Sequence, residues 1–315
     1  METLFQNADK VIIGNGDVLE KASVLIDGKN IIAVGRDVTA ESADIIDCSG
    51  KVLMPGLIDV HVHIALFAGE VNWDHLAHIR DDYLAVRACT YLNWWIENGF
   101  TTIFEPFARG DLPFELRRAL RNGIVNGPRL LVSGGGVTGT ASMVKAIGPV
   151  EVTGPNEARQ KTRILTSLEY NIDILKIRTT AEMLEGQVES RLKLTAEEAA
   201  AAVDEAHRAG IPVHSHSYGG PGVKVAIDAG VQLIIHAQPI GWEFKPNLEY
   251  GDWQSNQLID GGKFADTNYM QNYDSMAERG IYWAPTLSYY YKIYNDHWEE
   301  FQEHNNPFTC GRVQL

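Results

Sequence analysis

The sequence predicts an α/β fold: a TIM (β/α)8 barrel that stops before its eighth strand, preceded by a small β-sandwich segment. Two observations lead to this. Up to about residue 50, short apolar runs alternate with Asx-Gly and Gly turns, which is typical of short β-strands. From residue 52, apolar runs alternate with long amphipathic stretches, which is the pattern of repeated βα units. We therefore divide the chain into an N-terminal β segment, 1–56, and a barrel, 57–315.

The N-terminal segment contains three apolar runs that each end near a glycine. They are residues 10–16, 22–28 and 31–35. Gly and Asx-Gly pairs supply the tight turns that join neighbouring strands. This pattern predicts a small antiparallel β unit without a catalytic role.

Seven further apolar runs predict the parallel strands of the barrel. They are residues 57–63, 101–105, 129–133, 172–177, 211–216, 231–236 and 281–286. The clearest helix precedes the fifth of these strands. Thr195 and Glu198 form a T-x-x-E capping box, and Gly210 ends the alanine-rich stretch that follows it.

Seven strands are one too few, because a barrel of this kind closes with eight and an open one exposes two strand edges. Residues 305–315 offer no eighth strand. We therefore expect a fragment, a prematurely ended reading frame, or a variant that lacks about a hundred residues of a complete barrel chain.

Composition excludes several classes of protein. Lys and Arg number 27 against 41 Asp and Glu, a net charge of −14, which would repel a nucleic-acid backbone. No apolar run approaches the about 18 residues of a membrane span, and the N-terminus lacks the features of a secretory signal. The three widely spaced cysteines fit buried thiols better than disulfides. These features predict a cytoplasmic protein without nucleic-acid or membrane partners.

Four of the ten histidines fall at or near predicted strand ends: His61, His63, His216 and His236. The carboxyl ends of parallel barrel strands are where active sites are built. His61 and His63 are one residue apart, so on a strand both imidazoles face the same way, and Asp59 continues that face. Imidazoles that converge from several strand ends are typical of a metal site.

Other residues near these strand ends leave alternatives open. Lys176 lies inside an apolar strand, and an ammonium beside a divalent cation would be repelled, so it must be neutral or converted to an anion. His214 shares the strand face of His216 and could be the ligand instead. Arg178 could bind a substrate carboxylate or form an ion pair. The glycines 134–136 could cradle a phosphate, as a metal-free sugar-phosphate barrel would require.

The run VLMPGLIDVHVH, residues 52–63, resembles the signature of the amidohydrolase superfamily of metal-dependent hydrolases. Residues 99–102 and 127–131, with the blocks around Lys176, His216 and His236, resemble its imidazolonepropionase-like and prolidase-like branch. The resemblance implies a TIM barrel and a β-sandwich built from both chain ends.

The same resemblance implies a binuclear site with two divalent metal ions, expected to be Zn²⁺. His61 and His63 would bind the more buried ion, and a carboxylated Lys176 would bridge the two. His216 and His236 would hold the second ion, since the family's usual run aligns with His216 rather than His214. That alignment also places Tyr218 where a further histidine is common, which makes it, with Arg178, a candidate substrate-binding residue.

The implied activity is hydrolysis of an amide bond by a metal-activated hydroxide, of the prolidase-type dipeptidase kind. The alternatives are a cyclic amide hydrolase of the imidazolonepropionase type and an inactive truncated remnant. The chain departs from the family twice: residues 140–143 lack the expected loop histidine, and the strand-8 aspartate that would shuttle a proton is absent from the chain. A small molecule or dipeptide is the expected substrate, and a homo-oligomer is compatible with the sequence.

Overall fold

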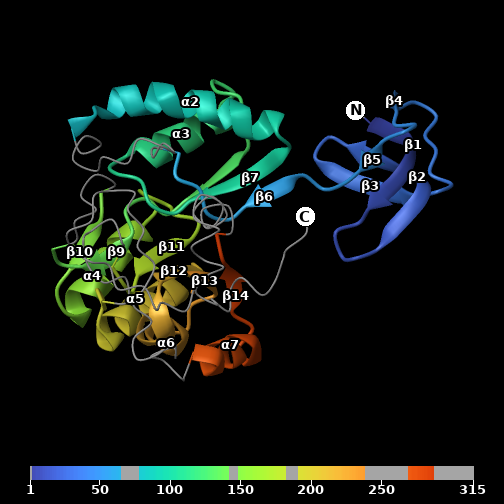
Figure 1. The fold of residues 1–315 in the computed structure, drawn as a ribbon. Helices are drawn as coiled ribbons and strands as arrows, with labels where there is room; N and C mark the ends of the chain where they lie inside the picture. Colours follow the sequence, from blue (N-terminus) through green and yellow to red (C-terminus); the bar gives the residue numbers. More distant parts are fainter. Residues whose placement is uncertain (1, 65–77, 142–147, 182–190, 238–268, 287–315) are drawn as a thin grey trace, which may run out of the picture. The chain divides into compact units, whose positions relative to one another are not determined.

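The computed structural model describes residues 2–64, 78–141, 148–181, 191–237 and 269–286 (Figure 1). The chain divides into two compact units, Met1–Leu57 and Ile58–Leu315. Within the described residues, no helix is both long and apolar enough to cross a membrane. The chain end that was expected to lack an eighth strand, 287–315, lies outside the described residues.

The first unit is a five-stranded sheet. Its strands are β1 Glu2–Ile12, β2 Val18–Asp27, β3 Asn30–Gly35, β4 Asp44–Asp47 and β5 Val52–Leu53. The first three form the expected antiparallel arrangement, in the order β3-β2-β1. The expectation of a wholly antiparallel unit is wrong, however, because β4 and β5 both pair with β1 in the parallel sense. Ala8, Val11 and Ala22 are buried in its small core.

The second unit alternates strands and helices, as the βα pattern predicted. Its strands are β6 Leu57–Asp59, β7 Phe100–Glu105, β8 Arg129–Val132, β9 Val137–Gly139, β10 Val150–Val152, β11 Leu175–Arg178, β12 Val213–Ser217, β13 Leu233–His236 and β14 Tyr282–Ala284. Its helices are α2 Asp81–Glu97, α3 Leu112–Arg121, α4 Pro155–Leu165, α5 Ala196–Arg208, α6 Gly219–Ala229 and α7 Tyr269–Glu278. All seven predicted barrel strands have a counterpart, whereas β9 and β10, of three residues each, were not predicted.

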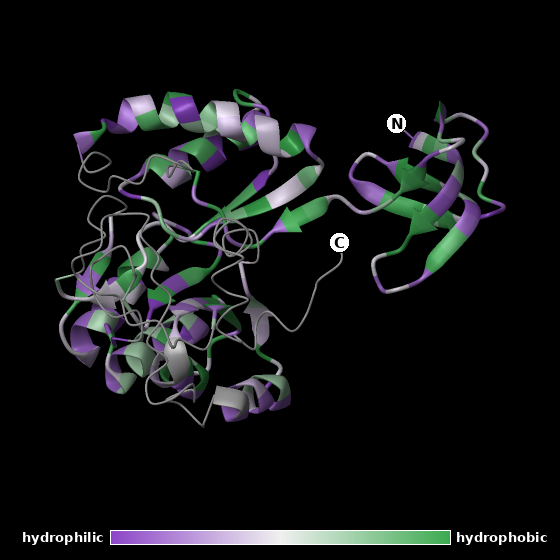
Figure 2. Ribbon diagram, viewed as in Figure 1, coloured by the Kyte–Doolittle hydropathy of each residue, from purple (hydrophilic) through white to green (hydrophobic). Residues whose placement is uncertain are grey.

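The strands of this unit form two sheets, ordered β6-β7-β8 and β10-β9-β11-β12-β13-β14. The pairings of β7 with β8 and of β11, β12, β13 and β14 in succession are parallel. This confirms an α/β fold built on parallel sheets. Helices α2 and α3 pack against the first sheet and α4, α5 and α6 against the second, and Figure 2 shows hydrophilic and hydrophobic residues mixed along these helices, as expected when one side is buried.

Asp173 joins the two sheets between β8 and β11. Its backbone N donates to Val132 O at 2.9 Å, and Val132 N donates to its Oδ2, also at 2.9 Å. Arg117 of α3, which is buried, donates to the same carboxylate oxygen at 2.7 Å. Within β11 itself, Lys176 N donates to Ser133 Oγ at 2.8 Å. These bonds place the end of β8 beside the start of β11, while the later part of β11 pairs with β9 at Ile177.

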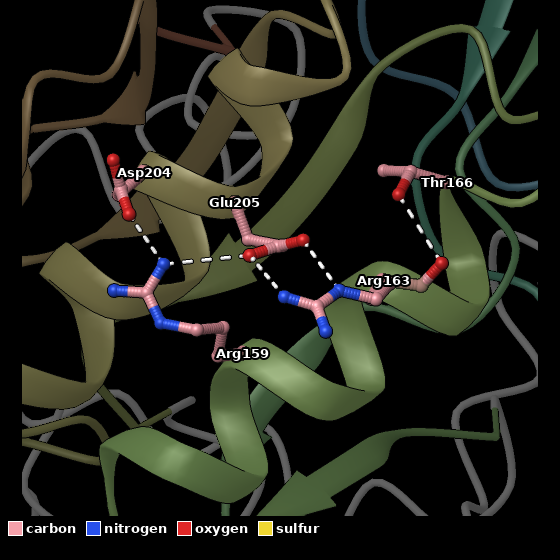
Figure 3. Close-up of polar contacts among 5 residues, drawn as sticks. All are labelled: Arg159, Arg163, Thr166, Asp204 and Glu205. Carbon is pink, nitrogen blue, oxygen red and sulfur yellow. Dashed lines mark hydrogen bonds and ion pairs between the residues drawn. The ribbon is translucent and has the colours of Figure 1, made fainter.

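Helix α5 begins and ends where the sequence predicts. The Thr195 hydroxyl accepts from Glu198 N, the Glu198 carboxylate accepts from Thr195 N, and Gly210 follows the helix with a φ of 73°. The helix is held to α4 by ion pairs around Glu205 (Figure 3). Arg163 donates to both carboxylate oxygens of Glu205 at 2.7 and 3.0 Å, and this lowers the pKa of Glu205. Arg159 bonds both Asp204 and Glu205.

Candidate active site

His61 and His63 lie just beyond a strand rather than on one. Strand β6 ends at Asp59, whose Oδ1 accepts from His61 N at 3.0 Å and bends the chain away from extended geometry. The predicted strand 57–63 is therefore too long by four residues. The two imidazoles are nevertheless neighbours, with ring centroids 4.9 Å apart in an edge-to-face arrangement.

Lys176 and His214 meet because β11 and β12 pair in register. Lys176 lies opposite His214, and its Nζ is 3.4 Å from His214 Nε2. Both side chains are buried. The His61 ring contacts the His214 ring at a centroid distance of 5.3 Å, which connects the end of β6 to the centre of the second sheet.

His236 reaches the same place from the end of β13. Its ring centroid is 5.7 Å from that of His61. The backbone of His236 and Ala237 has φ of 69° and 50°, which is a costly conformation for residues other than glycine. Trp283 Nε1 donates to His236 O at 2.6 Å and Tyr273 OH donates to Ala237 O at 2.9 Å, so two aromatic side chains hold this bend.

His216 lies opposite Arg178, two residues further along the same two strands than His214 and Lys176. Its Nε2 lies 3.2 Å from Ala181 O, an acceptor, so this nitrogen carries the proton. Its ring packs edge-on against His236 at 4.7 Å and against Tyr218 at 4.8 Å. Tyr218 stacks on His236 with centroids 4.5 Å apart. The structure thus brings all the predicted site residues together, but it separates His214 from His216.

Glu105, the last residue of β7, is a site residue that sequence analysis missed. Its carboxylate is fully buried and 3.2 Å from His63 Nδ1. It also accepts from Ile64 N at 2.6 Å and Phe107 N at 2.9 Å. The signal was present in the sequence, because a carboxylate ends an apolar strand at the same edge of the sheet as the histidines.

The electrostatics of the site favour neutral imidazoles. Burial lowers the pKa of His61, His214, His216 and His236 well below 6.5, and the Lys176 ammonium lowers it further. Burial also raises the pKa of the Asp59 carboxyl. A neutral imidazole presents a lone pair, which is the form that binds metal ions.

The donor chemistry of this cluster fits divalent metal ions. Several buried imidazoles converge there, and Nδ1 of His61 and of His214 are enclosed without a hydrogen-bond partner in the part of the chain that the structure describes. A buried polar atom without a partner is costly unless a ligand satisfies it. No three His, Cys, Asp or Glu side chains among the described residues are arranged as a ready-made metal site, however.

The glycines 134–136 pack closely against the site and do not form an open anion cradle. A Cβ on Gly136 would lie 2.3 Å from the Phe107 ring and 2.8 Å from Cγ of Lys176, and one on Gly135 would lie 2.4 Å from Gly148 O. The absence of side chains at 135 and 136 is therefore explained by close packing. Nothing in this packing favours the sugar-phosphate alternative.

The buried histidines predict a protein that loses stability as the pH falls below neutrality. In the folded chain they stay neutral, whereas in the unfolded chain they take up protons below about pH 6.5, so stability is present above that pH and declines below it. Each histidine contributes a slope of up to about 1.4 kcal/mol per pH unit. The measurement is the urea midpoint between pH 7.5 and 5.5.

The raised pKa of Asp59 acts in the opposite direction, because its protonated form is favoured in the folded chain. One carboxyl opposes at least three imidazoles, so the net effect in this range remains a loss of stability with acid. A urea midpoint that stays constant or rises from pH 7.5 to 5.5 would contradict neutral histidines.

The sequence is similar to a known protein family and to parts of several curated proteins. Residues 52–282 match the Amidohydrolase family. A dihydroorotase of Streptococcus thermophilus is 33% identical over 100 residues, which are 30% of this chain and 21% of that protein. A dihydroorotase of Streptomyces coelicolor is 46% identical over 57 residues, 18% of this chain and 13% of that protein. The chain thus matches only about a fifth or less of the length of these curated relatives.

Solved structures match over most of the chain. A Xaa-Pro dipeptidase with bound methionine has a TM-score of 0.74 at 26% identity, covering 94% of this chain and 69% of that one. A prolidase complexed with N-methylphosphonate-L-proline has a TM-score of 0.73 at 25% identity, with 96% and 70% covered. An ochratoxinase of A. niger, with a TM-score of 0.75 at 20% identity and the same coverage, supports the fold alone.

Proposed function

The chain belongs to the amidohydrolase family, and from that premise we propose that it hydrolyses an amide bond at a site for two divalent metal ions. The observation that carries the proposal is the approach of Lys176 Nζ to His214 Nε2 at 3.4 Å, with the rings of His61 and His236 beside them. Neutral imidazoles beside a buried lysine are suited to binding divalent metal ions, and polar side chains of this kind contribute little to the packing of an apolar core.

The proposed ligands come from three strands and the loop after β6. They are His61, His63, Lys176, His214 and His236. His61 and His63 would hold one ion, and Lys176, carboxylated to an anion, would bridge to the second, as the family resemblance suggests. We propose Zn²⁺, which prefers imidazole nitrogen and carboxylate-like oxygen.

We propose His214 rather than His216 as the ligand from β12, which reverses the choice made from the sequence. His214 faces Lys176 and His61, and its Nδ1 is enclosed without a partner. His216 instead directs Nε2 at Ala181 O and lies two residues further along β12, beside Tyr218 and Arg178. The family alignment selected His216, and strand alternation alone could not separate the two, because both histidines share one face of the strand.

When bound, the metal ions would supply a hydroxide at neutral pH and polarise the scissile carbonyl. The chain's own part is to hold the imidazoles neutral and oriented in a buried place. Arg178 is buried two residues beyond Lys176 on the same strand, where its guanidinium would bind the carboxylate of a dipeptide. Tyr218, stacked on His236, would form part of the same substrate subsite.

The experiment that tests this proposal is metal analysis of the purified full chain together with hydrolysis of a panel of Xaa-Pro dipeptides and a cyclic imidazolone. We expect about two zinc ions per chain and hydrolysis of dipeptides. Hydrolysis of the cyclic substrate alone would favour the imidazolonepropionase type. A folded chain with neither metal nor activity would be an inactive remnant.

His63→Ala should remove metal and hydrolysis together, because it deletes one of the two proposed ligands that follow β6, His61 and His63. His207→Ala is the matched control, since His207 is exposed on α5 and bonds Gln232 away from the site. Full activity and unchanged metal content in His63→Ala would sink the proposed site.

A further inference from the structure

We propose that Glu105 is a positioning residue that orients His63 and fixes which of its two ring nitrogens carries the proton. This inference deepens the proposed function, on which it rests. Glu105 contributes no ligand in the proposed site. It lies behind His63, on β7, and contacts Nδ1 of the imidazole at 3.2 Å.

The hydrogen bonds around Glu105 decide the direction of that contact. Its Oε2 accepts from Ile64 N and its Oε1 from Phe107 N, at 2.6 and 2.9 Å. A carboxylate can only accept, so the bond at 3.2 Å is donated by His63 Nδ1–H. The proton of a neutral His63 is therefore on Nδ1, and the lone pair is on Nε2, the nitrogen that remains for a metal ion.

His236 shows the same arrangement with a different partner. Thr286 Oγ1 donates to Pro285 O at 2.7 Å, so it has no proton left for His236 and accepts from His236 Nδ1–H at 2.9 Å. The lone pair of His236 is then also on Nε2. Two of the proposed ligands thus have Nδ1 engaged by an acceptor, an arrangement that fixes ring orientation in metal sites generally.

Glu105 also sets the position of His63 through the backbone. The two main-chain groups that it accepts from belong to two segments: Ile64 directly follows His63, and Phe107 follows β7 and, like Lys176, lies close to Gly136. One buried carboxylate therefore ties the loop after β6 to the end of β7.

The test compares Glu105→Gln with Glu198→Gln. Glu198 is a matched control, because it too is a buried carboxylate that accepts from two backbone N–H groups, of Gly154 and Thr195, but contacts no histidine among the described residues. At position 105, a glutamine amide nitrogen in the place of Oε1 would donate to His63 Nδ1, favour the proton on Nε2 and leave Phe107 N–H unpaired; in the place of Oε2 it would leave Ile64 N–H unpaired.

Two readouts are needed, in the full chain with ¹⁵N-labelled histidine. NMR of the metal-free protein, with the His63 signal identified by its loss in His63→Ala, reports which nitrogen carries the proton. Chelator competition reports zinc affinity. We expect Nδ1–H in the unmodified chain, and in Glu105→Gln a shift of the proton toward Nε2 and a fall in zinc affinity of about 10- to 100-fold. Glu198→Gln should change neither.

A proton on Nε2 of His63 in the unmodified chain would overturn the proposal. This part of the test needs no variant at position 105, so it holds even if Glu105→Gln does not fold. Equal zinc affinity in Glu105→Gln and Glu198→Gln would also overturn it, since Glu105 would then be structural only. If the unmodified chain shows Nδ1–H but takes up no zinc, the Glu105 contact is supported and the proposed metal site is contradicted.

Discussion

Replacing Lys176 with arginine should abolish hydrolysis. Arginine keeps the positive charge but cannot be carboxylated, so it cannot become an anionic ligand between two ions. Its fixed charge would also lie close to His214, whose Nε2 is 3.4 Å from the Nζ of Lys176. Losing metal-based stabilisation of several kcal/mol corresponds to at least about a 100-fold fall in kcat/KM. Steady-state hydrolysis and metal content of the same preparations measure the effect.

Lys224→Arg is the control for this substitution, because Lys224 is exposed on α6 and pairs only locally with Asp228 among the contacts described. It should retain full activity. Hydrolysis by the unmodified chain should also rise when bicarbonate is added to a bicarbonate-depleted preparation. A Lys176→Arg protein that keeps its metal and its activity would show that this lysine is not carboxylated for catalysis.

Replacing His214 with alanine should have the second largest effect, and replacing His216 a much smaller one on metal. His214→Ala removes the imidazole that faces Lys176 and His61. We expect it to lose at least one metal ion and at least about 100-fold in kcat/KM, since a metal-polarised carbonyl contributes several kcal/mol.

His216→Ala should keep both ions, because Nε2 of His216 is occupied by Ala181 O, and its effect should appear in KM through the neighbouring Tyr218. Both variants are measured by metal analysis and steady-state kinetics. If His216→Ala loses metal while His214→Ala keeps it, the sequence alignment was right and the ligand assignment made from the structure is wrong.

Periodic patterns in the sequence predict most of the fold. Apolar runs separated by amphipathic stretches locate seven of the nine strands described in the second unit, and the capping box of Thr195 and Glu198 with Gly210 locates both ends of α5. These features depend on a few neighbouring residues, so they can be recognised without tertiary information. Strands β4 and β5 show the limit: their parallel pairing with β1 is made by contacts distant in the sequence.

The sequence predicts which residue types form the candidate site, but it does not predict which of these residues contact one another. A histidine at a strand end is visible in the sequence, but the partner of each imidazole is not. The choice between His214 and His216 depends on strand register, which places Lys176 opposite the first and Arg178 opposite the second. Glu105 was missed for the same reason, because its contact with His63 spans 42 residues.

The joint at Asp173 has a consequence for how the second unit unfolds. His61 and His63 follow a strand of one sheet, while Lys176, His214 and His236 belong to the other. An ion bound to both sets would link the two sheets, and any ligand that binds only the folded chain stabilises it by mass action. Without zinc, amide exchange could distinguish the halves as separate foldons, whereas with zinc they should open as one cooperative unit.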